Sequence, residues 1–305
     1  MLDNSKIKKA AREQLKSRWQ IPFIAVLTSF IISFLLTTTE KMIAPDTITS
    51  ALFAVFKLIC TAIFGFSVVK ISLDLTRKSG ELSFTDYTDS FTYISPVIRA
   101  FLWVIFWIII FILIITVPSS FIFLLSSGIA LLKSINFENF SFSQDFNFEK
   151  FENFTAPEEF FTTLFTQYLG LAILMIVLFF VLLAVMIFKL LQYSQIMYVI
   201  ADNKNVSARK AMRLSIEYMK GHKGELFCLY LSFFGWFLLC LVPGFFTELL
   251  SKAVSPKTAA LIMTLLISVT FSILGPYFNA SLANFYNAVK QDALESGRVK
   301  PEDLQ

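Results

Sequence analysis

Long runs of apolar residues recur along this chain and are separated by more polar stretches. Six runs reach the length of about 20 helical residues that crosses a hydrocarbon core, and they cover residues 21–38, 51–73, 97–117, 168–191, 225–243 and 258–278. None of them alternates polar and apolar positions, as the strands of a membrane barrel do. The pattern therefore predicts an all-α membrane protein with about six transmembrane helices.

A polar or amphipathic segment precedes the first, third and fifth runs, at residues 1–20, 83–96 and 207–224. Each segment contains a serine placed to cap a short helix, and these are Ser5, Ser83 and Ser207. In the first segment, basic residues surround an apolar stripe formed by Ile7, Ala11, Leu15 and Trp19. Basic amphipathic helices of this kind lie in the plane of the lipid headgroups, so we expect three in-plane helices.

The distances between landmark residues repeat along the chain. Pro118 follows Ser83 by 35 residues, and Pro243 follows Ser207 by 36. Repeats at a fixed period indicate one structural unit used several times. We therefore interpret residues 1–305 as a single polytopic domain of three units, each an in-plane helix followed by a transmembrane hairpin. The alternative is a set of unrelated hairpins with ordinary basic flanks.

The region after the third run is unusual. Residues 119–132 are too short to cross the bilayer again, so we expect a bent helical extension or a re-entrant segment. Residues 134–167 then combine ten Phe with six acidic residues and one base, Lys150. Because disordered acidic segments are poor in aromatic residues, we expect this extracytoplasmic loop to fold onto the outer leaflet or to cap the bundle. A structural lid and a binding site for a partner or cation remain alternatives.

Composition and charge agree with a membrane protein and give it an orientation. The chain is 56% hydrophobic and only 16% charged, with a mean hydropathy of +0.69, whereas soluble domains carry roughly 25% charged residues. Of the 26 Lys and Arg residues, 20 fall on the side of the two termini and five on the other. The positive-inside rule therefore predicts cytoplasmic termini.

Several classes of chemistry lack the residues they need. The chain has one His, His222, and three Cys, all in apolar runs, which excludes His-rich metal centres and a disulfide-stapled fold. We predict no metal and no cofactor. No Ser/His/Asp, Cys/His or paired-carboxylate arrangement has a credible spacing, so an enzyme is unsupported. The bases flank membrane spans rather than forming a basic domain, so nucleic acid is not a predicted partner.

Two features inside the spans are candidate sites. Lys57 is the one charge well within a span; it could extend to the interface, pair with Glu40 or Glu248, or contact a substrate. The last run contains Gly-Pro at positions 275 and 276, followed by the polar residues Tyr277, Asn279 and Asn284. Together with Pro243 in the fifth run, this pattern predicts broken helices, which form ion or substrate sites in transporters or simple kinks in other bundles.

A basic, glycine-rich turn precedes the fifth run. Glycines let a backbone approach an anion, and helix N-termini favour phosphate. A lipid headgroup is the nearest phosphate, and the candidate ligands are Lys220, Gly221, Lys223 and Gly224 in this turn and Lys16 and Arg18 before the first run. Positive-inside anchoring alone is the alternative. We expect His222 in the same turn to be solvated.

Several short stretches resemble the signature of a bacterial integral membrane family known as domain of unknown function 975. The similar stretches are KKAAREQLK at 8–16 with Trp19, YMKGHK at 218–223, LSFFGW at 231–236, GPY at 275–277 and FY at 285–286. The chain departs from the family after the fifth run, where Val-Pro-Gly stands at 242–244 in place of a Gly-Ile-Gly type turn. The resemblance implies a multi-pass protein of a bacterial cytoplasmic membrane and no particular activity.

These observations favour a non-enzymatic membrane protein that binds anionic lipid headgroups or a membrane protein partner at its cytoplasmic face. The alternatives are a small transporter or permease subunit, suggested by the Pro-containing runs and Lys57, and a membrane enzyme acting on lipid.

Overall fold

The computed structural model describes residues 3–43, 47–134, 158–300 and 302. Every element within these residues is a helix, and six are long and apolar enough to cross a membrane. The predicted all-α membrane fold is therefore confirmed. The elements are α1 Asn4–Leu15, α2 Gln20–Ile43, α3 Thr47–Arg77, α4 Phe84–Asp89, η1 Ser90–Tyr93, α5 Ile94–Ser134, α6 Glu158–Tyr193, α7 Ile196–Asp202, α8 Ala208–Tyr218, α9 Lys223–Phe245, α10 Thr247–Ser251 and α11 Pro256–Glu295.

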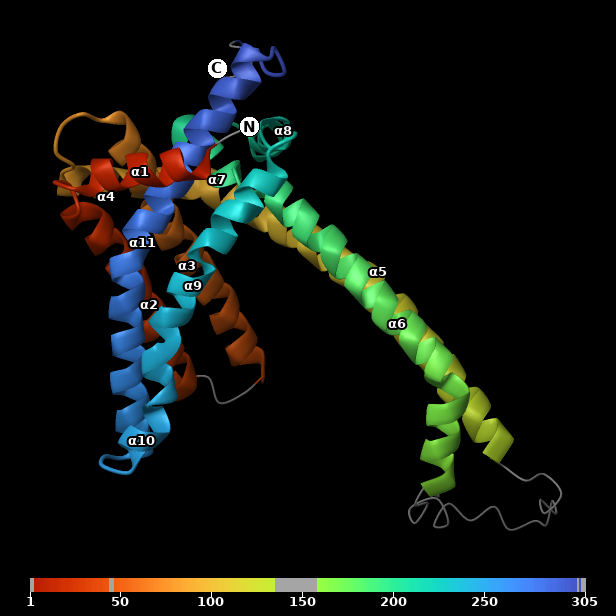
Figure 1. The fold of residues 1–305 in the computed structure, drawn as a ribbon. Helices are drawn as coiled ribbons and strands as arrows, with labels where there is room; N and C mark the ends of the chain where they lie inside the picture. The colour runs from red at the N-terminus through yellow and green to blue at the C-terminus, as the bar shows by residue number, and fades with distance from the viewer. Residues whose placement is uncertain (1–2, 44–46, 135–157, 301, 303–305) are drawn as a thin grey trace, which may run out of the picture. The chain divides into compact units, whose positions relative to one another are not determined.

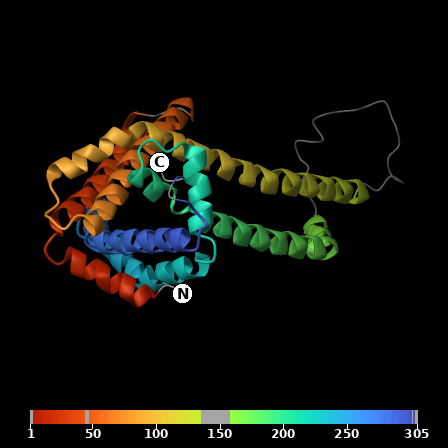
Figure 2. The same cartoon turned by 90° about the horizontal axis from the view of Figure 1, so that it is seen from above.

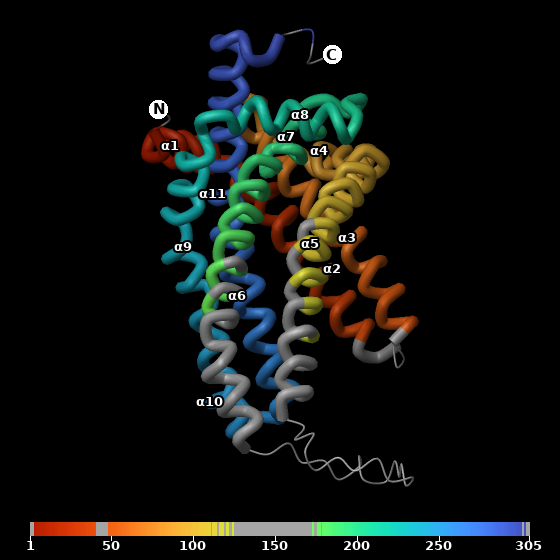
Figure 3. The backbone as a smooth tube through the Cα atoms, turned by 90° about the vertical axis from the view of Figure 1, so that its right-hand side faces the viewer, coloured from red at the N-terminus to blue at the C-terminus, as the bar shows by residue number. Residues whose placement is uncertain are grey.

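The chain divides into two compact units. The first contains Met1–Val104 and Lys189–Gln305. The second contains residues 105–188, and its described residues belong to α5 and α6. In the first unit, α11 packs against α1, α2, α3 and α9. The helix α1 lies near the start of α9 and crosses α11, which continues beyond it toward the C-terminus (Figures 1 and 2). The short helix α10 joins α9 to α11 at the end far from α1 (Figure 3).

The caps of the short helices agree with two of the three serine predictions. Ser83 forms a capping box with Asp86 at the start of α4, and the Ser207 side chain accepts from the backbone N–H of Lys210 at the start of α8. Ser5 is not a cap. The Asp3 carboxylate accepts from the backbone N–H groups of Ser5 and Lys6, because a carboxylate is the stronger acceptor at a helix N-terminus.

The short helices pack on different parts of the first unit, and α8 packs on α7 and α11. The α4–η1 segment packs on α2 and α3, where the hydroxyls of Tyr87 and Thr28 lie 2.8 Å apart. The helix α8 contacts the end of α6, because the Ser215 hydroxyl donates to the carbonyl of Gln192 at 2.9 Å. The first helix, α1, packs on α11 and α9 of the last hairpin.

Of the two alternatives for the Pro-containing spans, the structure contradicts the discontinuous helix. Both Pro243 and Pro276 lie inside continuous helices, α9 and α11. Prolines are tolerated in membrane helices when neighbouring helices and side chains compensate for the missing N–H donor. The Asn279 side chain donates to the carbonyl of Gly275 at 2.9 Å, and Gly275 packs against Val26 of α2. Pro276 leaves the carbonyl of Ser272, four residues earlier, without its usual donor, so these contacts support the helix beside the Gly-Pro pair and do not replace that bond.

The structure also changes the region around the Phe-rich loop. α5 continues as a helix past Pro118 to Ser134, so residues 119–132 extend the third span. α6 begins at Glu158, so Glu158 to Gln167 are helical and the predicted loop at 134–167 is too long. Its remaining residues, 135–157, lie outside the described part of the chain. The short helix α7 was not predicted.

Candidate functional site

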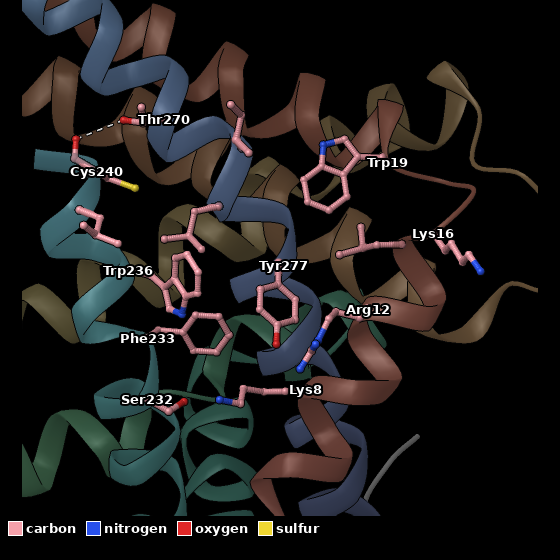
Figure 4. Close-up of a pocket in the computed structure, with 14 residues that line it drawn as sticks. Lys8, Arg12, Lys16, Trp19, Ser232, Phe233, Trp236, Cys240, Thr270 and Tyr277 are labelled. Carbon is pink, nitrogen blue, oxygen red and sulfur yellow. Dashed lines mark hydrogen bonds between the residues drawn. The ribbon is translucent and has the colours of Figure 1, made fainter. Parts of the chain in front are cut away.

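A groove of about 990 Å³ lies in the first unit between α1 and the α9–α11 pair. One edge is basic and comes from Lys8, Arg12 and Lys16 of the α1 segment, whereas the walls are mostly apolar and aromatic (Figure 4). The aromatic residues are Trp19, Phe233, Trp236 and Tyr277. Small-molecule sites have volumes of about 300–1,000 Å³, so the groove is large enough for a substantial ligand.

The helical period of α1 sorts its side chains into two faces. Ile7, Ala11 and Leu15 are buried against the bundle, because residues three and four apart share one side of a helix. Lys8, Arg12 and Lys16 also recur every four residues, so they form a row along the groove. Local sequence therefore places the three cations together, and packing of the apolar face decides what they cover.

Polar contacts hold α1 over the groove. Gln14 and Asn284 of α11 exchange two amide hydrogen bonds, at 3.2 Å and 2.7 Å. The Asn4 side chain donates to the carbonyl of Glu225 at 3.0 Å. Because hydrogen bonds between side chains far apart in sequence constrain both partners, α1 has a defined position relative to α9 and α11.

Two of the cations lie against aromatic rings. The Lys8 ammonium is 5.6 Å from the centroid of the Phe233 ring, and the Arg12 guanidinium is 5.7 Å from that of Tyr277. Aromatic rings attract cations but carry no net charge. Among the described residues, no carboxylate forms an ion pair with Lys8, Arg12 or Lys16. No paired carboxylate in that part of the chain therefore balances the charge of the basic edge, so this edge can attract an anion.

The structure brings only two of the predicted site residues into this groove, Lys16 and Tyr277. Arg18 instead donates to the backbone carbonyls of Lys78 and Gly80. Asn279 and Asn284 form the helix-supporting contacts described above. The Lys57 ammonium lies 3.1 Å from the Glu40 carboxylate. An ion pair with Glu40 was one of the alternatives for Lys57.

The glycine-rich turn predicted to hold phosphate lies between α8 and α9, outside the groove. Gly221 has a φ of +90°, a conformation that suits glycine. The Arg298 guanidinium donates to the carbonyl of Lys220 at 2.8 Å, which ties the turn to the segment after α11. Lys223 and Gly224 begin α9. This turn therefore has a structural partner within the chain.

The expectation that His222 is solvated is wrong. Its side chain is only 12% exposed and lies between two carboxylates, with Nδ1 2.7 Å from Glu225 and Nε2 2.9 Å from Asp292. Arg298 also donates to Asp292. Because Asp292 belongs to α11, this cluster joins the α8–α9 turn to the last helix.

Sequence reasoning missed four residues that matter in the groove, namely Lys8, Arg12, Phe233 and Trp236. The four-residue spacing of Lys8, Arg12 and Lys16, followed by Trp19, was a signal that could have selected the cations. No comparable signal assigned Phe233 and Trp236, because their position beside α1 depends on contacts over more than 200 residues of sequence.

Comparison with known proteins agrees with this architecture. The family described as "Protein of unknown function (DUF975)" matches residues 1–293. The chain belongs to this family. The match spans α1, α9 and nearly all of α11, so every residue that lines the groove lies in the DUF975 region. No curated protein and no solved structure matches the chain.

Proposed function

We propose that this DUF975 protein binds an anionic membrane lipid in the groove under α1. The lipid phosphate lies at the basic edge, between Lys8 and Arg12, and an acyl chain follows the apolar walls of α9 and α11. The observation that carries this proposal is a row of cations without carboxylate partners placed directly over an aromatic and apolar groove.

The chemistry of the groove matches the two parts of a lipid. Leu239, Ile273 and Leu274 line the wall away from α1, and burying apolar surface is favourable by roughly 25 cal/mol per Å². Trp19 and Trp236 have an apolar ring and one N–H donor each, a combination favoured at membrane interfaces. Basic pockets between membrane helices are typical sites for anionic headgroups.

We expect the groove to discriminate against lipids without net negative charge. Replacing Lys8 and Arg12 together by Gln should weaken binding of phosphatidylglycerol about 30-fold, because each basic residue near an anionic surface contributes about 1 kcal/mol. The affinity is measured by titrating the purified protein with a fluorescent phosphatidylglycerol in detergent micelles. Phosphatidylcholine serves as the neutral comparison.

Lys9→Gln is the matched control, because Lys9 is exposed on α1 and does not line the groove. It removes one positive charge from the same helix, so a purely general charge effect would give half of the double variant's free-energy loss. Unchanged affinity in the Lys8→Gln and Arg12→Gln double variant would show that the groove cations do not bind the lipid. A loss in Lys9→Gln of half that size would show that general charge rather than the groove attracts it.

We further propose that α1 and both termini face the cytoplasm, which places the groove at the inner leaflet. The distribution of Lys and Arg supports this orientation through the positive-inside rule. A fluorescent protein that folds only in the cytoplasm should be bright when fused after Gln305. An alkaline phosphatase fused at the same position, which is active only outside the cytoplasm, should be inactive. The reverse pattern would overturn this orientation.

A further inference from the structure

The three cations of the groove form two separate positions. Figure 4 shows the Lys8 and Arg12 side chains extending toward α9 and α11, whereas the Lys16 ammonium points away from them. Lys8 and Arg12 also lie over aromatic rings. With a rise of 1.5 Å per residue, Lys16 lies about 12 Å beyond Lys8 along α1. A phosphate between Lys8 and Arg12 therefore leaves Lys16 without an anion.

The charge of the groove favours a ligand with more than one negative group. Its lining contains Lys8, Arg12 and Lys16 and no acidic residue. A lipid with one phosphate leaves two positive charges uncompensated in the groove, whereas a lipid with two phosphates leaves one. Since nearby like charges repel, and do so more strongly beside an apolar surface than in water, the second phosphate should be favourable.

We propose that the preferred ligand is a lipid with two phosphate groups joined by a short linker, of the cardiolipin type. One phosphate binds Lys8 and Arg12, and the other binds Lys16 at the mouth of the groove. The volume of about 990 Å³ lies at the upper end of the range for small-molecule sites, which suits a lipid with several acyl chains. This inference rests on the proposed function, because it names the lipid class for the same groove.

The test compares cardiolipin with phosphatidylglycerol, which carries the same type of phosphate diester once. The full chain in detergent is titrated with each lipid at equal phosphate concentration. We expect the unmodified protein to bind cardiolipin about fivefold more tightly than phosphatidylglycerol. This factor corresponds to about 1 kcal/mol, the electrostatic contribution of one basic residue near an anionic surface. Lys16→Gln should remove this preference by lowering the affinity for cardiolipin more than that for phosphatidylglycerol, whereas Lys9→Gln should leave the preference unchanged.

The possible outcomes separate this inference from the proposed function. Equal affinity for the two lipids in the unmodified protein overturns the inference, as does a preference that survives Lys16→Gln. In both cases the proposed function stands if the Lys8→Gln and Arg12→Gln double variant binds phosphatidylglycerol more weakly than the unmodified protein. If that double variant binds phosphatidylglycerol normally, the groove is not the lipid site, and the proposed function fails as well.

Discussion

Asp202→Asn is expected to lower the free energy of unfolding by about 2–3 kcal/mol, less than the roughly 3–5 kcal/mol for a fully buried ion pair, because Arg77 is 36% exposed and water screens part of the interaction. The carboxylate of Asp202, at the end of α7, pairs with Arg77 of α3 and with Lys290 of α11. It also accepts from the hydroxyl of Tyr286 at 2.9 Å. The amide has no charge, so both cations would lose their counter-ion in a partly desolvated position.

The surroundings of Asp202 make the loss costly. Its side chain is 16% exposed, and the Tyr286 ring packs between those of Tyr198 and Tyr218, with centroids 5.4 Å and 5.8 Å away. Water therefore has limited access to replace the carboxylate. This cluster joins three helices that are distant in sequence, so its loss should destabilise the whole first unit.

Unfolding of purified protein, by heat or by increasing denaturing detergent, measures the effect of Asp202→Asn. Asp89→Asn is the matched control, because Asp89 is exposed and forms no ion pair among the described residues; its effect should stay within about 0.5 kcal/mol. Equal stability of the two variants would mean that the Asp202 cluster contributes little to the fold.

Gly275→Ala should destabilise the protein by about 1–3 kcal/mol, the usual cost of overpacking a core. A Cβ atom added at Gly275 would lie 2.8 Å from one methyl carbon of Val26 and 3.2 Å from the other. Val26 is buried in α2, and a β-branched side chain in a helix has essentially one rotamer. It cannot rotate away, so α2 and α11 would have to separate.

A second substitution at the contact tests this explanation. Val26→Ala removes both methyl groups, so the double variant with Gly275→Ala should be more stable than the sum of the two single changes predicts. Gly235→Ala is the control in α9, where an added Cβ meets no atom within 4 Å. It should be neutral or stabilising, because Ala favours a helix over Gly. Additive effects at positions 26 and 275 would exclude a direct steric contact.

The features that the sequence predicted correctly depend on local interactions, and those that it predicted wrongly depend on contacts in the folded chain. The caps at Ser83 and Ser207 were predictable because capping acts over three residues. The cap at the first helix was assigned to Ser5 instead of Asp3, an error of two residues at a boundary. At Pro276 the sequence left a break and a kink as alternatives, because the contacts that Asn279 and Val26 make beside it require the folded helix and its neighbour.

The candidate site also has one part that local sequence predicts and another that only the fold determines. The row of Lys8, Arg12 and Lys16 follows from a four-residue period and needs only that the segment is helical. The opposite wall of the groove, with Phe233, Trp236 and Tyr277, comes from two helices near the other end of the chain. His222 was expected to be solvated because its local sequence is polar, yet Asp292, which lies 70 residues away, encloses it.

The sequence by itself determined the membrane class and the six helices, because the hydrophobic effect and backbone hydrogen bonding in lipid act on each apolar run separately. It also determined the amphipathic character of α1. Only the tertiary structure decided which hairpin α1 packs on, which cations lack a carboxylate partner among the described residues and where the groove lies. These properties depend on packing and ion pairing between segments distant along the chain, and no local pattern records which segments meet.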